Sequence, residues 1–362
     1  MHEFARASSV RSVVRVTGNY SSETPLHPAA MESLLAAFEQ GWADPKKISQ
    51  QSARAAILRN QSLENIAHRL GLSPDTIEVL GEPYLGHYLG IAGLLDESST
   101  FVYSATDKGK IRAIARNHPG PVLGLEVDHG GQLIWPKNFP TKGVLSLQLA
   151  NGETGVLHNV TRNTELLEHA THIAIDATTS GPRVALPSRW STALFDAQSW
   201  AGPAGLGILA INTSAYRYPL PHLAPIKSPG SFSLPLLIAA AVALENFVEE
   251  APDIRHRAVA MLGSCDGIDV VAADSSAVSN KLSLVVSGVA GEQLVRALSE
   301  RGFTVDSGSA CSPADLQPSH VLAAMGYPTT GQIRLTLHRG VTETEIGELV
   351  DALTSTVAAL RG

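Results

Sequence analysis

The chain has 362 residues, of which 44% are hydrophobic and 17% charged, and its formal net charge is −7. An acidic chain lacks the basic excess that a broad nucleic-acid surface requires, so we expect no nucleic-acid partner. Its two cysteines, Cys265 and Cys311, lie far apart in the sequence and provide neither a disulfide framework nor a zinc site, which favours a cytoplasmic protein.

The first part of the chain alternates helical and strand patterns. Apolar residues at three- and four-residue spacing over residues 31–72 predict helix. Short apolar runs without strict alternation come next, and such runs are typical of strands that are buried on both faces. They cover residues 122–127, 143–149, 172–175, 193–195 and 205–211. We therefore predict an α/β fold with a largely parallel sheet.

A second pattern begins near Pro225 and predicts a smaller α+β module. Its expected elements are helices at 234–248, 291–300 and 318–325 and strands at 281–286, 303–305 and 332–337. Thr342 and Glu345 have the spacing of a capping box, which predicts the start of a last helix. The apolar run in the first of these helices is too short to span a bilayer, so we expect no membrane association. We place the boundary near Ser228, which gives a large domain of residues 23–228 and a small domain of residues 1–22 and 229–362.

Polar, turn-rich segments follow several of the predicted strands. They cover residues 150–155, 176–180, 196–203 and 306–313. Ligands of open α/β sheets bind at the carboxyl ends of the strands, so these segments are the expected place for a site.

The order of these segments resembles that of the cysteine desulfurases, within the class V aminotransferase family of pyridoxal-phosphate enzymes. Residues 200–207 (WAGPAGLG) are similar to the family's lysine-loop segment, and residues 307–311 (SGSAC) resemble the loop with the catalytic cysteine. Residues 176–178 and 332–336 are similar to the cofactor-ring segment and the substrate-carboxylate strand. The resemblance implies a homodimer with the type I fold of pyridoxal-phosphate-dependent transferases. In that fold a large domain with a mixed, mostly parallel seven-stranded sheet precedes a small α+β carboxy-terminal domain.

The resemblance also implies roles for individual residues. Cys311 would carry the substrate sulfur as a persulfide, and Asn151 and Arg334 would bind the substrate. Pyridoxal phosphate would be contacted by Asp176, Thr179, Lys108, Asn151, Gln198 and Ser231.

Three departures from the family pattern bear on this chemistry. The position of the Schiff-base lysine is Ser199, whose hydroxyl cannot form an imine, and no lysine lies between Lys142 and Lys227. Residues 82–85 (EPYL) stand at the phosphate turn, where proline removes a backbone donor and glutamate repels an anion. Lys108 takes the place of the histidine that would cover the cofactor ring.

We therefore expect pyridoxal phosphate to bind weakly or not at all. The main hypothesis is a pseudoenzyme that acts as a partner, a scaffold or a sulfur-relay protein through Cys311. Its partner would be an active desulfurase or a sulfur acceptor protein.

Other interpretations stay open from the sequence. One is an active pyridoxal-phosphate-dependent desulfurase or aminotransferase with unusual cofactor anchoring, with Lys108 as a substitute amine. Another is a vacated pocket that binds a different small anion. Cys311 and Asp176 also fit an inherited loop cysteine and a loop cap, and His87, His158 and Trp200 fit purely structural roles.

Overall fold

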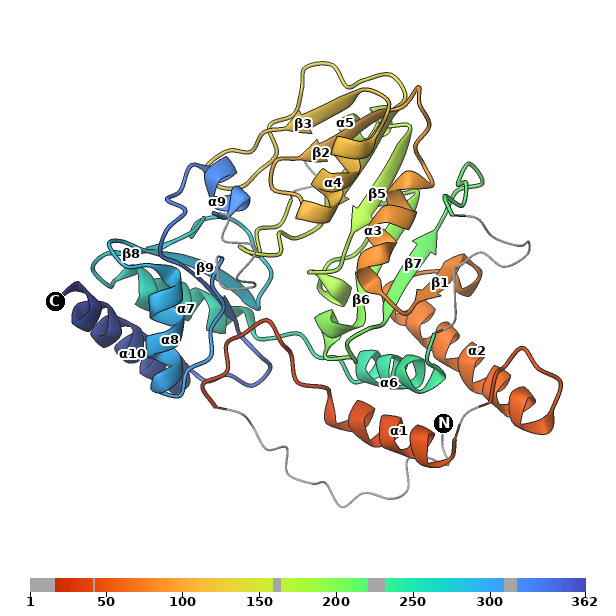
Figure 1. Cartoon of the computed structure of the whole chain (residues 1–362), viewed down its shortest axis with the longest axis horizontal. Helices are drawn as coiled ribbons and strands as arrows, with labels where there is room; N and C mark the ends of the chain where they lie inside the picture. The colour runs from red at the N-terminus through yellow and green to blue at the C-terminus, as the bar shows by residue number, and fades with distance from the viewer. Residues whose placement is uncertain (1–16, 42, 159–163, 221–231, 309–317) are drawn as a thin grey trace.

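The computed structural model describes residues 17–41, 43–158, 164–220, 232–308 and 318–362. A seven-stranded sheet forms its larger part (Figure 1). The strands are β1 (Ile77–Leu80), β2 (Thr100–Ser104), β3 (Val122–Leu125), β4 (Gly143–Gln148), β5 (His172–Asp176), β6 (Thr192–Asp196) and β7 (Gly207–Ile211). Their order is β1-β7-β6-β5-β4-β2-β3; the neighbours from β6 to β3 run parallel, and β7 runs antiparallel to both β6 and β1. The predicted α/β fold with a largely parallel sheet is confirmed.

Helices cover both faces of this sheet. On one face lie α3 (Pro83–Ala92) and α4 (Gly109–Asn117), and on the other α1 (Pro28–Glu39), α2 (Gln50–Leu70) and α6 (Leu234–Glu245). A short helix, α5 (Thr164–His169), precedes β5. Because successive side chains of a strand point to opposite faces and both faces are covered, the central strands β4 and β6 are buried along their whole length.

The helical pattern of residues 31–72 corresponds to two helices, α1 and α2, so the expected helical character is confirmed over most of this range. The segment between them contains Pro45, which lacks a backbone donor. Ser49 then begins α2 as its cap, since its Oγ accepts a hydrogen bond from the backbone N–H of Ser52 at 3.0 Å. Strands β1 and β2 were not predicted from the sequence.

A three-stranded antiparallel sheet forms the second part of the molecule. Its strands are β8 (Ile268–Val270), β9 (Lys281–Val286) and β10 (Gln332–Thr336), in the order β10-β9-β8. Around it lie α7 (Pro252–Gly263), α8 (Gly291–Glu300) and α10 (Glu343–Arg361), with α9 (His320–Met325) between the two sheets (Figure 1). The capping box of Thr342 and Glu345 is confirmed.

The strand expected at residues 303–305 is absent from the described residues. Thr304 makes only an isolated bridge with Asn19, because its partner is a single residue near the start of the described chain. The boundary expected near Ser228 falls outside the described residues, so the division into residues 23–228 and the rest stays a prediction.

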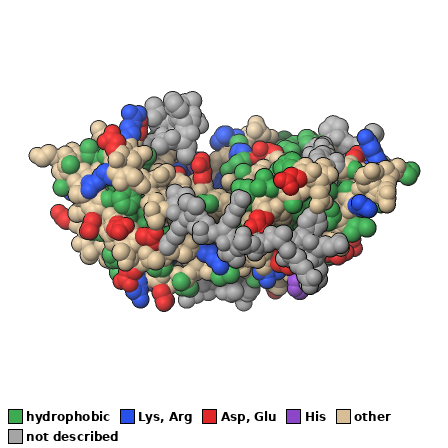
Figure 2. Space-filling model, turned by 90° about the horizontal axis from the view of Figure 1, so that it is seen from below, with side chains coloured by type: hydrophobic (Ala, Val, Ile, Leu, Met, Phe, Trp, Pro, Cys, Tyr) green, Lys and Arg blue, Asp and Glu red, His purple; other side chains and the backbone are tan. Residues whose placement is uncertain are grey.

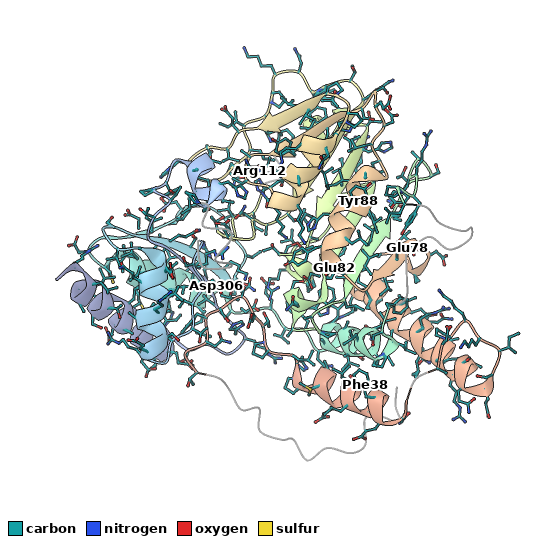
Figure 3. All side chains as sticks on the ribbon, viewed as in Figure 1. Phe38, Glu78, Glu82, Tyr88, Arg112 and Asp306 are labelled. Atoms are coloured by element: carbon teal, nitrogen blue, oxygen red, sulfur yellow. The ribbon has the colours of Figure 1, made fainter. Side chains whose placement is uncertain are left out.

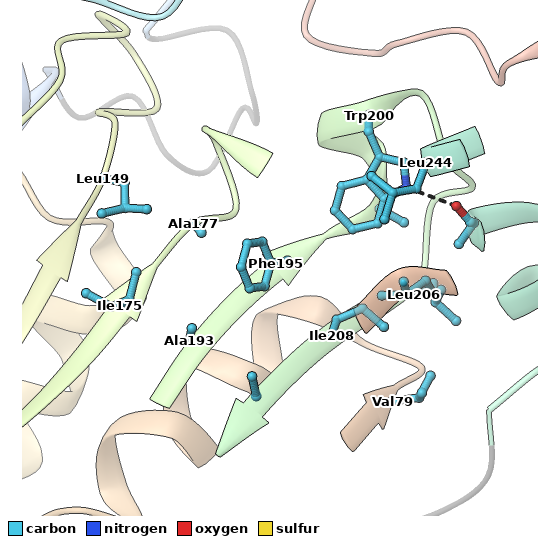
Figure 4. Close-up of a cluster of buried hydrophobic side chains, with 14 of the residues drawn as sticks. Val79, Leu149, Ile175, Ala177, Ala193, Phe195, Trp200, Leu206, Ile208 and Leu244 are labelled. Carbon is cyan, nitrogen blue, oxygen red and sulfur yellow. Dashed lines mark hydrogen bonds between the residues drawn. The ribbon is translucent and has the colours of Figure 1, made fainter. Parts of the chain in front are cut away.

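The main hydrophobic core includes residues at the carboxyl ends of β5 and β6. Phe195 and Trp200 are each 1% exposed, and the indole N–H of Trp200 donates to the carbonyl of Ala240 at 3.1 Å (Figure 4). Trp200 therefore packs in the core, as the sequence suggested, and fixes the short 3₁₀ turn Ala197–Trp200 that follows β6.

None of the helices in the described part of the chain has both the length and the apolar character needed to cross a membrane. Charged side chains of both signs are scattered over the face seen in Figure 2, without one large patch of a single sign.

Candidate functional site

A cavity of about 440 Å³ lies between the two sheets, and we call it the inter-sheet cavity. The seven-stranded sheet contributes the segments after β5 and β6, and the three-stranded sheet contributes the start of β9 and the segment after β10. Residues discussed below that line it are His27, Pro83, Tyr84, Lys108, Thr178, Thr179, Arg183, Asp196, Gln198, Ser199, Trp200, Glu250, Lys281, His338 and Arg339. In Figure 3, Glu82 at the start of α3 and Asp306 beside the three-stranded sheet lie on opposite sides of this region.

Asp176, the last residue of β5, is bound by two basic side chains. Its Oδ2 lies 3.1 Å from Nε2 of His87 and 3.2 Å from Nζ of Lys108. Its Oδ1 accepts hydrogen bonds from the N–H and hydroxyl of Thr178, at 2.9 and 2.5 Å, and Lys108 also donates to that hydroxyl. All four contacts lie at the carboxyl end of β5, where the sequence placed a site.

The charge balance at Asp176 keeps it ionised. Burial by itself would raise the pKa of this carboxyl, but the positive charges of Lys108 and His87 and the hydrogen bonds from His87 and Thr178 outweigh it. The pKa of Asp176 therefore lies well below its usual range. His87, which the sequence suggested was structural, is part of this cluster; no residue spacing signals the contact, because His87 comes from α3 and Asp176 from β5.

Ser199 lines the inter-sheet cavity in the 3₁₀ turn after β6. Its hydroxyl donates to the carbonyl of Asp196 at 2.7 Å, and its own carbonyl accepts from Nη1 of Arg183 at 2.6 Å. Gly181 lies so close that a Cβ added there would be 2.3 Å from Oγ of Ser199. The serine hydroxyl is thus bonded within its own turn.

The amino-terminal end of α3 is capped by the protein's own carboxylate. Oε1 of Glu82 accepts a hydrogen bond from the backbone N–H of Tyr84 at 2.9 Å, and Pro83 has no N–H to offer. Asp196 stands nearby as a second acid, with a pKa raised mainly by its burial. The helix end that could hold an anion therefore already faces carboxylates.

The structure places three residues that the resemblance assigns to cofactor binding. Thr179 and Gln198 line the inter-sheet cavity. Asn151 is buried. Its Oδ1 accepts from the N–H groups of Glu153 and Thr154, and its Nδ2 donates to the carbonyl of Thr106. Asn151 thus holds the loop after β4, and it is not among the lining residues described for the cavity.

Arg334 lies on β10, at the edge of the three-stranded sheet. Its Nη2 donates to the carbonyl of Ser307 at 2.9 Å, and its backbone bridges to Asp306. It supports the start of the segment that leads to Cys311. Cys311 and Ser231 themselves lie outside the described residues.

Three charged residues at the cavity were not found from the sequence. Arg183 and Glu250 form a buried two-point ion pair, with Nη2–Oε1 at 2.5 Å and Nε–Oε2 at 2.8 Å. Lys281, at the start of β9, lines the same cavity. In the sequence, Lys281 stands out only as a single cation in front of an apolar strand. No sequence pattern points to Arg183, because its partner Glu250 is far away in the sequence.

The described side chains include no group of three or more His, Cys, Asp or Glu residues arranged to hold a metal ion. What this region does offer is hydrogen-bonding groups and charges of both signs around an open volume. Such a site suits a small polar molecule.

Known proteins are similar to this chain in sequence and in fold. A family model described as aminotransferase class-V matches residues 225–349. A cysteine desulfurase of Klebsiella pneumoniae is 26% identical over 366 residues, which cover 94% of this chain and 92% of that protein. Cysteine desulfurase 2 of Trichormus variabilis is 29% identical over 237 residues, 60% of this chain and only 59% of that relative's length.

Among solved structures, a NifS-like protein superposes with a TM-score of 0.84 at 19% identity, covering 95% of this chain and 100% of its own. The expected fold is thereby confirmed: a mixed, mostly parallel seven-stranded sheet with helices, of the type I pyridoxal-phosphate class.

Proposed function

We propose that this chain, a NifS/IscS-like member of the class V aminotransferase family, is a degenerate cysteine desulfurase homologue that forms no Schiff base at Ser199. The observation that carries the proposal is the Ser199 hydroxyl itself. It lies in the turn after β6, on the wall of the inter-sheet cavity, and donates to the carbonyl of Asp196. A hydroxyl cannot form an imine, and this turn offers no amine in its place.

The family depends on pyridoxal phosphate, and the residues of this chain do not fit that group. A phosphate at the start of α3 would meet the Glu82 carboxylate that already accepts from Tyr84, beside the acid Asp196. Like charges at hydrogen-bonding distance repel, and Pro83 removes one of the donors that a phosphate would use. Both features support weak binding or none.

The ring end of the site supports the same proposal. Asp176, which the resemblance assigns to the cofactor nitrogen, is already bound by Lys108 and His87. The Lys108 amine lies 3.2 Å from Oδ2 of this carboxylate and also donates to the hydroxyl of Thr178, so both groups already hold it in place. Lys108 is thus a poor substitute for the missing lysine.

Purified protein incubated with excess pyridoxal phosphate and then desalted is expected to show no aldimine absorbance band. It is also expected to release no sulfide from cysteine. A retained band together with sulfide release would overturn the proposal and favour an active enzyme with unusual anchoring.

We further propose that the protein is a homodimer and relays sulfur through Cys311. The Cys311 thiolate attacks the outer sulfur of a persulfide on an active desulfurase. The sulfur–sulfur bond of the donor breaks, the donor thiolate leaves, and Cys311 becomes the persulfide, so no external oxidant is needed. This step requires a thiolate and no pyridoxal phosphate. Cytoplasmic location, where such thiols stay reduced, remains a prediction.

After incubation with an active desulfurase and cysteine, mass spectrometry is expected to find one added sulfur atom on Cys311. Cys311→Ser should abolish the transfer completely. Cys265→Ser is the matched control: this half-buried thiol already donates to the carbonyl of Met261, so its loss should leave transfer unchanged. Transfer that persists in Cys311→Ser, or no transfer to the unaltered protein, would contradict the relay.

A further inference from the structure

Lys281 lines the same inter-sheet cavity as Ser199 and comes from the three-stranded sheet. It is the first residue of β9, and its Nζ donates to Oγ1 of Thr336 on the paired strand β10 at 2.8 Å. Its carbonyl accepts from Nε of Arg255 at 3.1 Å, so the backbone at this point is fixed as well. Two adjacent strands therefore hold the amine at a set position on the cavity wall.

The partner of this amine is a hydroxyl and not a carboxylate. The described residues give Lys281 no ion pair, whereas Lys108 lies against the carboxylate of Asp176. A hydroxyl can accept from the amine without holding it in the charged form. The amine of Lys281 thus has a neutral hydrogen-bond partner, whereas that of Lys108 has an anionic one.

The surroundings of Lys281 favour its neutral form. Burial lowers the pKa of this amine to about 8, and the positive charges of Arg334, Arg183 and Lys108 act in the same direction, while Asp306 opposes them. An ordinary lysine has a pKa near 10.5. Around neutral pH the neutral fraction of Lys281 therefore exceeds that of a surface lysine by on the order of a hundredfold.

A proton-transfer group and a carboxylate-binding group line the same cavity. Burial and then the nearby charge of Lys281 lower the pKa of His338 below its ordinary value. Its Nε2 is buried without a hydrogen-bond partner among the described residues. Arg339 contributes a guanidinium whose Nη1 lies 3.5 Å from Nε2 of His27, and guanidinium is well suited to carboxylates.

We propose that Lys281 forms an imine with the carbonyl group of a small oxo acid bound in the inter-sheet cavity. The nitrogen lone pair attacks the carbonyl carbon, and the carbonyl oxygen leaves as water after two protons have moved to it. His338 accepts and returns protons during this step, and Arg339 binds the carboxylate of the oxo acid. The reaction needs no oxidant and no pyridoxal phosphate, so it goes beyond the proposed function.

The test is reductive trapping on the full chain with pyruvate and sodium cyanoborohydride, followed by peptide mass mapping. One adduct per chain is expected, on Lys281, at a rate at least tenfold above that of the exposed Lys142 in the same sample. The rate at Lys281 should rise with pH and level off above about 8.

Two variants sharpen this test. Lys281→Arg keeps a cation that can donate to Thr336 but cannot form an imine, so the specific adduct should disappear while the thermal unfolding midpoint stays near that of the unaltered protein. Lys142→Arg changes an exposed lysine whose Nζ donates to Oγ of Ser98, and it should leave the Lys281 adduct unchanged. Adducts spread over surface lysines, or an adduct on Lys108 in preference to Lys281, would overturn the proposal.

This test and the cofactor test fail in different ways. A pyridoxal-phosphate band that Lys281→Arg removes would contradict the proposed function while it supports a reactive Lys281. No adduct with pyruvate and no band would leave the proposed function standing and overturn the present inference.

Discussion

Replacing Arg183 with alanine is expected to lower the free energy of unfolding by about 3–5 kcal/mol, because it leaves a buried carboxylate without its ion-pair partner. The side chains of Arg183 and Glu250 are only 3% and 9% exposed. Arg183 also donates to the carbonyl of Ser199 and stacks over the ring of Phe247, 4.9 Å from its centroid. The one remaining described partner of Glu250 would be the hydroxyl of Ser279. Urea unfolding monitored by circular dichroism measures the loss.

The control for this prediction is an ion pair on the surface. Arg296 pairs with Glu292 one helical turn away, and their side chains are 76% and 47% exposed. Water and salt screen such a pair, so Arg296→Ala should cost less than about 1 kcal/mol. Equal losses for the two variants would contradict the assignment of a buried pair to Arg183. In a double-mutant cycle, Arg183→Met with Glu250→Gln should cost less than the sum of the two single changes.

Replacing Asp107 with asparagine is expected to stabilise the protein at pH 8 by a few kcal/mol and to have little effect below pH 4. Asp107 is fully buried beside Asp176, and burial is the main cause that raises the pKa of its carboxyl to about 7. Its Oδ2 accepts from the backbone N–H of Ser104, an acceptor role that asparagine can keep.

The sign of this effect follows from proton binding in the two states. Between pH 4 and pH 7 the unfolded chain has lost the Asp107 proton and the folded chain retains it, so the unaltered protein loses stability as the pH rises. Each unit of pKa corresponds to about 1.4 kcal/mol, and the difference becomes constant above about pH 7. Asparagine does not titrate, so the variant escapes this loss. Unfolding free energies measured at pH 4, 6 and 8 give the comparison.

An exposed aspartate provides a control of opposite sign. Hydrogen bonds from Ser98 and Ser99 lower the pKa of Asp96 to about 2, so its contribution to stability is present above pH 4 and is lost as the pH falls. Asp96→Asn should therefore reduce stability at pH 8, where Asp107→Asn increases it. If Asp107→Asn destabilised the protein equally at every pH, this result would contradict a raised pKa for the buried carboxyl of Asp107.

Local patterns predicted much of the fold and failed where pairing partners are distant. The strand β9 and the helix α8 were predicted to the residue, and the capping box at Thr342 marked the start of α10. The break between α1 and α2 was missed, and Thr304 pairs with Asn19 only as a single bridge. Apolar periodicity reports which face of an element is buried, but it does not report which other segment buries it.

The sequence by itself, through the family resemblance, predicts that Ser199 stands at the lysine position, that Pro83 stands at the phosphate turn and that the resemblance reaches Cys311. These are statements about identity at a position, and they need no coordinates. Only the tertiary structure decided that Lys108 and His87 both bind Asp176, and that Lys281 lines the same cavity as Ser199. The reason is physical: the charge state of a side chain depends on burial and on neighbours within a few ångströms, and here those neighbours come from distant parts of the chain.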